Sequence, residues 1–394
     1  MQTIDASLYW LIPGPRALIQ RIATDVLRVR VMVVNLPKIP VPGTLDGITK
    51  GLSEAHLDPV VQLNVHSSTD IASEVGVHFG SGQRRISAPE LARLRNFTPR
   101  TVLLQPQSRE GQVLCDAYTQ QFMETTAHSD GNVHLVTMIH EPNLKEGGQQ
   151  GDIQVLAFDG GLTKDEMEAY VALRMATRTG PGSTRLMRAI VSEFAGFDAE
   201  FAEKLISLDD GLIVRIREHL GLLMGEGHNR WRTKSWLLGT ESIVSTQPHV
   251  LHEFYLSEHG TPDQKVRAQT SIDQRYWRAC LKAITPWIEE RRHEVLRPFL
   301  PQLQATAAQS EDGRIEIPAG NRTRRIDPSE IEFNNIPAMV KAGELTAHTQ
   351  DQKNAVNICR QVKPVRDDIA HLRPPKEEKI IDLIQAMDSL IAIS

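Results

Sequence analysis

The stretch Val31-Met32-Val33-Val34-Asn35-Leu36 is an apolar run rich in β-branched side chains, and a proline-containing segment follows it directly. A run of this length and composition is typical of a buried strand. Similar runs alternate with helical stretches over residues 1–160. This alternation predicts a mainly parallel sheet with helices on its faces. The strands that we expect are Tyr9–Ile12, Val31–Leu36, Val60–Val65, Thr101–Gln105, Val133–Ile139 and Ile153–Phe158.

The first expected strand leads through Leu11-Ile12-Pro13-Gly14-Pro15-Arg16 into a predicted helix over residues 15–27. A P-loop nucleotide triphosphatase carries its phosphate loop at this place. That class needs a longer glycine-rich loop, a lysine for the terminal phosphate and a hydroxyl for magnesium. Only Gly14 and Arg16 are present as weak candidates for nucleotide binding, and no acidic pair ends a strand. We therefore expect no ATP hydrolysis and no bound cofactor.

The pattern changes to helices alone after Asp159-Gly160-Gly161. Thr163-Lys164-Asp165-Glu166 has the capping-box form that begins a helix, while Gly180-Pro181-Gly182-Ser183-Thr184-Arg185 indicates that one helix stops and another starts. A long helix is expected over Gln274–Leu296, with a kink at Pro286. Further on we expect a short strand pair near residues 315–317 and helices over 336–345, 350–362 and 376–391.

These patterns predict an α/β domain with P-loop-like topology followed by all-helical domains. The boundaries that we expect are 1–161 for the degenerate P-loop-like domain, 162–264 for a helical middle domain and 265–394 for a C-terminal helical domain. A chain of 394 residues is long enough for this division.

Composition narrows the class of protein. The chain is 40% hydrophobic and 24% charged, and its longest apolar runs are too short to cross a bilayer. The first residues lack the pattern of a secretory signal, so we expect a cytoplasmic protein. The three cysteines, Cys115, Cys280 and Cys359, stand far apart and predict neither a disulfide framework nor a metal cage.

The histidines do not indicate a metal site either. His249, His252 and His259 lie close together in the sequence, but no acidic or thiol ligands accompany them at metal-binding spacing. We interpret them as structural histidines and expect no bound metal.

The formal net charge of −5 gives the molecule no general basic field that would attract nucleic acid. Any RNA contact must therefore be local. Arg322-Thr323-Arg324-Arg325, beside Lys341, is one candidate, although a solvated loop explains any short basic run better.

The string with the clearest chemistry lies near the C-terminus and reads Pro364-Val365-Arg366-Asp367-Asp368-Ile369-Ala370-His371-Leu372-Arg373-Pro374. Arg366 and His371 have four residues between them, and a final amphipathic helix follows. This string resembles the active-site end of a HEPN-type ribonuclease domain. The resemblance implies a homodimer formed through the C-terminal helices and metal-independent RNA cleavage. Arg366, Asp367 and His371 are the catalytic residues that it implies, and we expect RNA contacts from Arg360, Lys363 and Arg373.

The residue types suit this chemistry. RNA cleavage without a metal requires one group to accept the proton of the 2′-hydroxyl, another to protonate the leaving oxygen, and fixed positive charge at the phosphate. An imidazole exchanges protons near neutral pH, and a guanidinium holds two phosphate oxygens while staying charged. Positions five apart on a helix point about 140° apart, so one chain does not close the site alone. A dimer supplies two copies of His371.

The N-terminal half resembles a degenerate AAA+ or STAND-type ATPase over roughly residues 5–240, through its topology rather than its motifs. Such proteins are common in bacterial defence. The resemblance implies an RNA-cleaving effector of a toxin or anti-phage system that is controlled by an ATPase-like sensor half, with a protein partner from the same operon.

Two alternatives remain open. One is a non-enzymatic sensor or scaffold subunit with a catalytically silent HEPN-like dimerisation domain, which the second carboxylate, Asp368, and the acidic net charge favour. The other is a regulator that binds a nucleotide without hydrolysing it.

Overall fold

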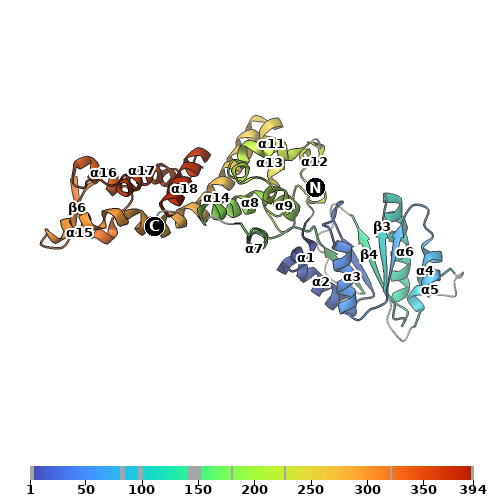
Figure 1. Ribbon diagram of the computed structural model, residues 1–394. Helices are drawn as coiled ribbons and strands as arrows, with labels where there is room; N and C mark the ends of the chain where they lie inside the picture. The colour runs from blue at the N-terminus through green and yellow to red at the C-terminus, as the bar shows by residue number, and fades with distance from the viewer. Residues whose placement is uncertain are drawn as a thin grey trace. The chain divides into compact units, whose positions relative to one another are not determined.

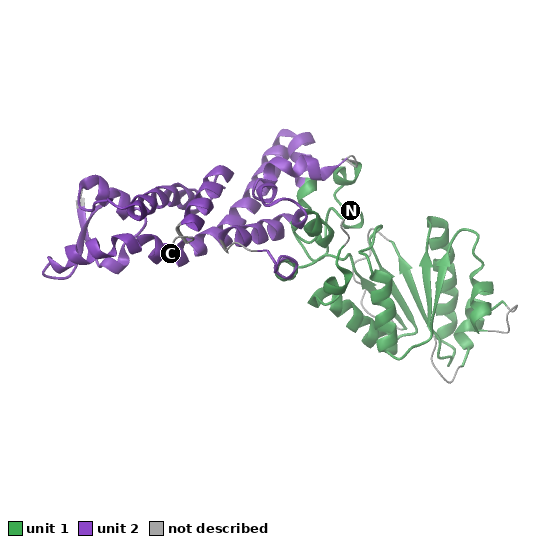
Figure 2. Ribbon diagram, viewed as in Figure 1, with its two compact units in different colours: residues 1–170, 195–204, 226–252 green, residues 171–194, 205–225, 253–394 purple. Residues whose placement is uncertain are grey.

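The computed structural model describes residues 4–79, 85–95, 101–140, 152–178, 181–225, 228–319 and 322–391. The chain forms two compact units, each built from several segments (Figure 2). Unit 1 contains residues 1–170, 195–204 and 226–252, and unit 2 contains residues 171–194, 205–225 and 253–394. The finer division into three domains stays a prediction.

A five-stranded, all-parallel sheet forms the centre of unit 1 (Figure 1). Its order is β2-β3-β4-β1-β5, so the first strand in sequence lies inside the sheet between β4 and β5. The α/β class is confirmed, together with five of the six expected strands. The strands are β1 (Val31–Asn35), β2 (Val60–Val65), β3 (Thr101–Pro106), β4 (His134–Ile139) and β5 (Ile153–Ala157).

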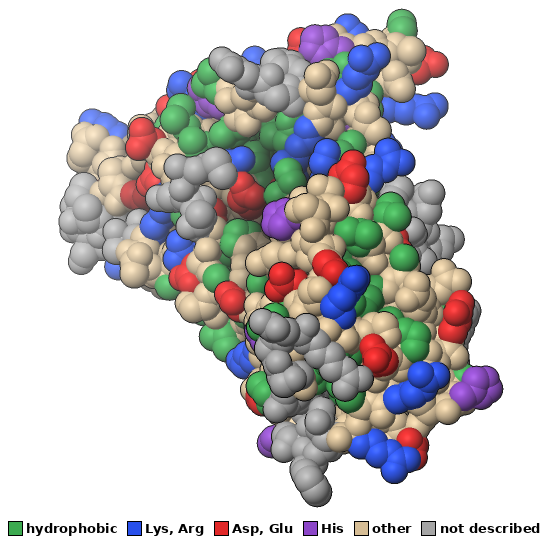
Figure 3. All heavy atoms as spheres, turned by 90° about the vertical axis from the view of Figure 1, so that its right-hand side faces the viewer, with side chains coloured by type: hydrophobic (Ala, Val, Ile, Leu, Met, Phe, Trp, Pro, Cys, Tyr) green, Lys and Arg blue, Asp and Glu red, His purple; other side chains and the backbone are tan. Residues whose placement is uncertain are grey.

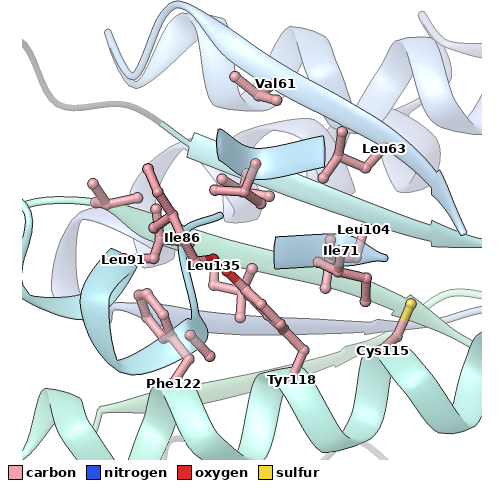
Figure 4. Close-up of a cluster of buried hydrophobic side chains, with 14 of the residues drawn as sticks. Val61, Leu63, Ile71, Ile86, Leu91, Leu104, Cys115, Tyr118, Phe122 and Leu135 are labelled. Atoms are coloured by element: carbon pink, nitrogen blue, oxygen red, sulfur yellow. Dashed lines mark hydrogen bonds between the residues drawn. The ribbon is translucent and has the colours of Figure 1, made fainter. Parts of the chain in front are cut away.

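Helices cover both faces of this sheet because successive strand side chains point to opposite sides. On one face, α2 (Pro13–Asp25) and α3 (Thr44–Glu54) pack against Met32 and Val34 of β1. The other face is covered by α4 (Ile71–Phe79), α5 (Ala88–Arg93) and α6 (Arg109–Thr126). In Figure 4, Cys115, Tyr118 and Phe122 point from α6 into the cluster of buried side chains on this second face.

The prediction of a strand over Tyr9–Ile12 is wrong, because these residues end one helix and lead into the next. Asp5 caps α1 (Ala6–Tyr9) by accepting from the N–H of Leu8 at 3.3 Å, and α2 begins at Pro13. Two prolines in the first turn of α2 favour a helix there. Tyr9 and Ile12 are buried, while Leu11 is 65% exposed. The Tyr9 hydroxyl donates to the carbonyl of Gly160 at 2.7 Å, and Trp10 packs beside Phe158.

The helices after the sheet follow the expected pattern. The capping box at Thr163 begins α7 (Lys164–Arg174), and the proline-glycine segment restarts a helix as α8 (Pro181–Ala195), with Gly180 outside the described residues. Shorter elements follow: α9 (Ala199–Ile206), α10 (Asp210–Val214), α11 (Ile216–Met224), α12 (His228–Arg232), η2 (Trp236–Leu238) and α13 (Val250–His259).

His249 and His252 are buried and engaged by protein groups. The Nε2 atom of His249 lies 3.3 Å from Oδ2 of Asp198, and its ring stacks on Trp231 with the ring centres 4.6 Å apart. The Nδ1 atom of His252 contacts the carbonyl oxygen of Trp231. Among the described residues, no cluster of His, Cys, Asp and Glu has the arrangement to hold a metal ion.

Unit 2 is built along α14 (Pro262–Leu296), a helix of 35 residues. It begins earlier than expected, because Thr261 and Gln264 form a capping box, and it continues through Pro286. The helices α17 (Gln350–Ala370) and α18 (Glu377–Ile391) pack against each other, and α17 also packs on α14 (Figure 1). Between α14 and α17 lie η3 (Arg297–Phe299), α15 (Leu300–Ala308), the antiparallel pair β6 (Ile315–Ala319) and β7 (Arg322–Ile326), η4 (Pro328–Glu330) and α16 (Asn335–Ala342).

A partly buried ion-pair network joins three helices of unit 2. Arg217 of α11 donates to Asp273 of α14 at 2.8 Å and to Glu377 of α18 at 2.7 Å, and its guanidinium lies 4.4 Å from the ring centre of Tyr276. Burial opposes the positive charge, but Glu377 and Asp273 outweigh this effect and raise the pKa of Arg217. The network therefore fixes the start of the last helix.

Among the described residues, no helix is both long enough and apolar enough to span a membrane.

Replacing Arg217 with alanine leaves two carboxylates facing each other without their cation. We expect Arg217→Ala to lower the free energy of unfolding by about 3 kcal/mol in a urea titration. Arg185→Ala is the matched control, because Arg185 pairs with Glu290 at 2.7 Å on an open surface. That control should lose less than about 1 kcal/mol. Equal losses in the two variants would show that the network contributes no more than a surface pair.

Candidate functional site

The C-terminal half of α17 has one buried face and one exposed face. Val362, Val365 and Ile369 are buried. On the opposite side, Arg360, Lys363, Asp367 and His371 follow one another at intervals of three or four residues. This spacing places them in one row along the helix, which we call the α17 stripe. Arg360, Lys363 and His371 are exposed, and the Asp367 side chain is half exposed.

The helix ends immediately before His371. Leu372 adopts a left-handed conformation with φ of 57°, and its N–H donates to the carbonyl of Ile369 at 3.1 Å. The N–H of Arg373 donates to the carbonyl of Asp368 at 2.9 Å. These two hydrogen bonds form a Schellman motif, in which glycine is the usual left-handed residue. His371 therefore occupies the C-cap, where the helix dipole favours a cation.

Trp277 of α14 holds this end of α17 through a hydrogen bond. Its indole N–H donates to the carbonyl of Ile369 at 2.8 Å. The same carbonyl also accepts from the N–H of Leu372, so the indole is an additional donor that ties this turn to α14. His371 follows two residues later on a turn that is held to α14.

Arg366 faces two carboxylates. Its Nη2 atom lies 3.4 Å from Oε1 of Glu289 on α14, and its Nη1 atom lies 4.0 Å from Oε2 of Glu332. The Arg366 side chain is 33% exposed. Both contacts are longer than a good hydrogen bond, so the guanidinium is attracted by the carboxylates without the two-pronged bonding that it makes at short range.

The two aspartates of the motif have partners of their own. The Nζ atom of Lys363 donates to Asp367 at 3.1 Å along the α17 stripe. Asp368 lies 3.2 Å from the Nζ atom of Lys379 on α18 and 3.6 Å from Arg373. In the sequence, Asp368 argues against RNA binding because it adds negative charge. In the structure, two cations compensate that charge.

One detail of the motif differs from expectation. The sequence predicts a helix over residues 350–362, which ends before Pro364. Instead α17 runs through Pro364 to Ala370, so Arg366 lies near its C-terminal end. The buried face continues on both sides of the proline, and this packing keeps the helix intact despite the missing N–H.

Arg366 and His371 share one helix end, but their positions point in different directions, about 140° apart on an ideal helix. Lys363 and Arg360 lie on the α17 stripe with His371. Arg373 follows the cap and is 64% exposed. Figure 3 looks onto the right-hand side of Figure 1, mainly unit 1, where acidic and basic side chains are interleaved among the described residues.

The nucleotide candidates Gly14 and Arg16 lie at the start of α2, after a helix instead of a strand. The N–H of Gly14 donates to Oε1 of Glu166. The other carboxylate oxygen accepts from the N–H and the hydroxyl of Thr163, both at 2.8 Å. The chain's own carboxylate therefore occupies the helix N-terminus, where a bound phosphate would otherwise lie.

A pocket of about 260 Å³ lies elsewhere in unit 1, at the carboxyl ends of β1 and β5. Ligands of open α/β sheets bind at this edge, where the strand order changes direction. The chain does change direction here, since it leaves β1 for the far edge and returns to β4. The pocket is lined by residues 37–41, 159–161, 197–200 and 237–239, with Ile4 and Arg230.

Two carboxylates in the pocket wall are used internally. Asp159 accepts from Ser242 at 2.6 Å and from the N–H of Ile243 at 2.7 Å. Burial opposes ionisation of Asp198, but its hydrogen bond to His249 and the nearby positive charge hold its pKa below the ordinary value. Lys38 and Arg230 are the cationic side chains in the lining.

Sequence reasoning missed this pocket. The signals were the proline-containing loop after Val31–Leu36 and the Asp159-Gly160-Gly161 segment after the last strand. They are far apart in the chain, and only the strand order brings them to one edge.

No known protein-family model matches the chain, and no curated protein matches it at a significant level.

The left-handed Leu372 gives a test of the cap geometry. A side chain in this conformation costs energy that glycine avoids, so Leu372→Gly should stabilise the protein by about 0.5 kcal/mol. Leu222→Gly is the control, because Leu222 is 79% exposed inside α11 and glycine should destabilise a helix interior by about 1 kcal/mol. Thermal or urea unfolding measures both. Loss of stability in both variants would argue against the left-handed cap.

Proposed function

We propose that this protein is a metal-independent RNA-cleaving effector of the HEPN type, acting in a bacterial toxin or anti-phage system under the control of its ATPase-like half. The observation that carries the proposal is the end of α17. Arg366, Asp367 and His371 all reach the surface there, on a turn held by Trp277. The all-helical unit 2 is compatible with the fold that the resemblance implies.

In this proposal the chemistry is a transfer within RNA. An imidazole accepts the proton of the 2′-hydroxyl, the 2′-oxygen attacks phosphorus, and the 5′-oxygen leaves with a proton from a second acid. The products are a 2′,3′-cyclic phosphate and a 5′-hydroxyl. Two copies of His371 in a homodimer supply the base and the acid, and Arg366 stabilises the charge on the phosphate oxygens.

The α17 stripe supplies the approach for the RNA backbone. Arg360 and Lys363 are exposed one turn apart and lead toward His371, and Arg373 lies just beyond it. Each phosphate that is neutralised in this way releases counterions, so RNA binding through the stripe should weaken as salt rises. The negative net charge keeps this binding local.

The pocket in unit 1 favours a role for that unit as a sensor that binds a nucleotide without hydrolysing it. Lys38 and Arg230 supply positive charge, and apolar side chains such as Ile39 and Leu237 line the same space. The ligand of this sensor and a protein partner from the same operon complete the proposal.

A second candidate function is a non-enzymatic scaffold subunit with a silent HEPN-like dimerisation domain. The pairing of Arg366 with Glu289 and Glu332 favours it, because a guanidinium held by two carboxylates is less free to bind RNA. Purified protein that leaves tRNA and mRNA intact, yet forms a stable complex with its partner, would support the scaffold.

The ribonuclease proposal predicts that His371→Ala abolishes RNA degradation and toxicity in cells while the protein still folds. Removing a general acid or base costs at least about a hundredfold in rate. His348→Ala is the matched control, since His348 is also exposed in unit 2 but lies before α17. RNA cleavage is followed by gel electrophoresis and folding by circular dichroism. Toxicity that survives His371→Ala would refute the proposal.

The sensor proposal predicts heat of binding when ATP is titrated into the protein in a calorimeter. Arg230→Ala should weaken this binding about tenfold, as expected for loss of a charged contact. Arg16→Ala is the control and should leave the affinity unchanged, because Arg16 lies at the start of α2 and does not line the pocket. The reverse pattern, with loss in Arg16→Ala alone, would move the site back to the first predicted position.

A further inference from the structure

Arg366 is approached by carboxylates from two separate elements. Glu289 comes from α14, and Glu332 comes from the segment between η4 (Pro328–Glu330) and α16. The contacts measure 3.4 Å and 4.0 Å. The residue that the proposed function assigns to RNA phosphate is therefore already facing two internal anions.

The backbone of Glu332 is fixed, while its side chain extends outward. Its N–H donates to Oδ1 of Asn335 at 2.8 Å, and its carbonyl accepts from the N–H of Asn335 at 3.0 Å. The Glu332 side chain is 57% exposed and contacts Arg366. A turn held at both ends thus presents one carboxylate toward this guanidinium.

Glu289 contributes differently. Its side chain is 41% exposed, and its other carboxylate oxygen lies 3.8 Å from Nη1 of Arg292, one turn along α14. Arg292 therefore shares the negative charge of Glu289. Glu332 is the carboxylate whose removal should change the environment of Arg366 most selectively.

We propose that Glu332, together with Glu289, forms an acidic clamp that occupies Arg366 in the resting protein and that RNA phosphate must displace. The inference rests on the proposed function and deepens it by adding regulation of the same site. A guanidinium binds carboxylate and phosphate through the same planar fork, so the two anions compete for it. The clamp is weak enough to open, because its contacts are long and partly exposed to water.

The clamp predicts that removing the charge of Glu332 strengthens RNA binding, and that this gain requires Arg366. Glu332→Gln keeps the size of the side chain and removes the competing anion. Loss of one partly exposed ion pair corresponds to a gain of about threefold in affinity. The gain should vanish in the Arg366→Ala background, where no guanidinium remains to be released.

The test uses the full-length protein and a fluorescent oligoribonucleotide with 2′-O-methyl groups, which binds but lacks the hydroxyl needed for cleavage. Fluorescence anisotropy gives the affinity of the wild type, Glu332→Gln, Arg366→Ala and the double variant. Glu344→Gln is the control for charge alone. Glu344 is exposed just after α16, and its substitution removes the same charge as Glu332→Gln. We expect about threefold tighter binding for Glu332→Gln only.

The outcomes separate the clamp from the ribonuclease. An equal gain in Glu344→Gln, or a gain that persists without Arg366, would overturn the clamp because it would reflect net charge. Unmodified RNA cleaved in a His371-dependent way, with no gain from Glu332→Gln, would overturn the clamp and keep the ribonuclease. An Arg366-dependent gain without His371-dependent cleavage would keep the clamp and remove the ribonuclease. Absence of RNA binding in every variant would contradict both.

Discussion

The hydrogen bond from the indole of Trp277 to the carbonyl of Ile369 is the interaction on which the candidate site depends. The N–H groups of Leu372 and Arg373 close the end of α17, and the indole ties this closed turn to the rest of unit 2. Here the donor comes from α14, which also carries Asp273 of the network that fixes the start of α18. One long helix thus positions both α17 and α18. The fixed position of Arg366 and His371 at the end of α17 therefore follows from packing within unit 2.

Internal carboxylates occupy the two places where the sequence suggests that a phosphate binds. Glu166 accepts from the N–H of Gly14 at the start of α2, and Glu289 and Glu332 face Arg366. An exposed cation or helix N-terminus attracts any nearby anion, and a tethered carboxylate is always nearby. The two cases differ in strength: Glu166 is held by several hydrogen bonds, whereas the contacts of Arg366 are long. Arg366 is therefore more accessible to an external phosphate than the N-terminus of α2 at Gly14.

Apolar runs were sufficient to predict the parallel sheet and five strands, because buried strands such as Val31–Leu36 carry almost no polar residues. They failed at Tyr9–Ile12, where a shorter run buries Tyr9 and Ile12 from a helical turn and Asp5 supplies the cap. The predicted helix end at residue 362 is also wrong. The buried face of Val362, Val365 and Ile369 outweighs the local propensity against a proline in a helix. The pocket beside β1 and β5 depended on strand order, and the contacts of Arg366 depended on helix packing. Neither is encoded in local spacing.

The distance between two copies of the α17 end in solution tests the proposed two-fold ribonuclease site most directly. A nitroxide label at Leu372→Cys, measured by pulsed electron paramagnetic resonance, reports this distance, since Leu372 is 70% exposed and directly follows His371. The native thiols are buried, and burial raises the pKa of Cys115 and Cys359 to about 12, so the label should react at the introduced thiol. We expect one short distance between copies that is lost when labelled protein is diluted with unlabelled protein. A protein that shows no coupling between copies, with its partner and RNA present, would contradict a two-fold ribonuclease site at His371.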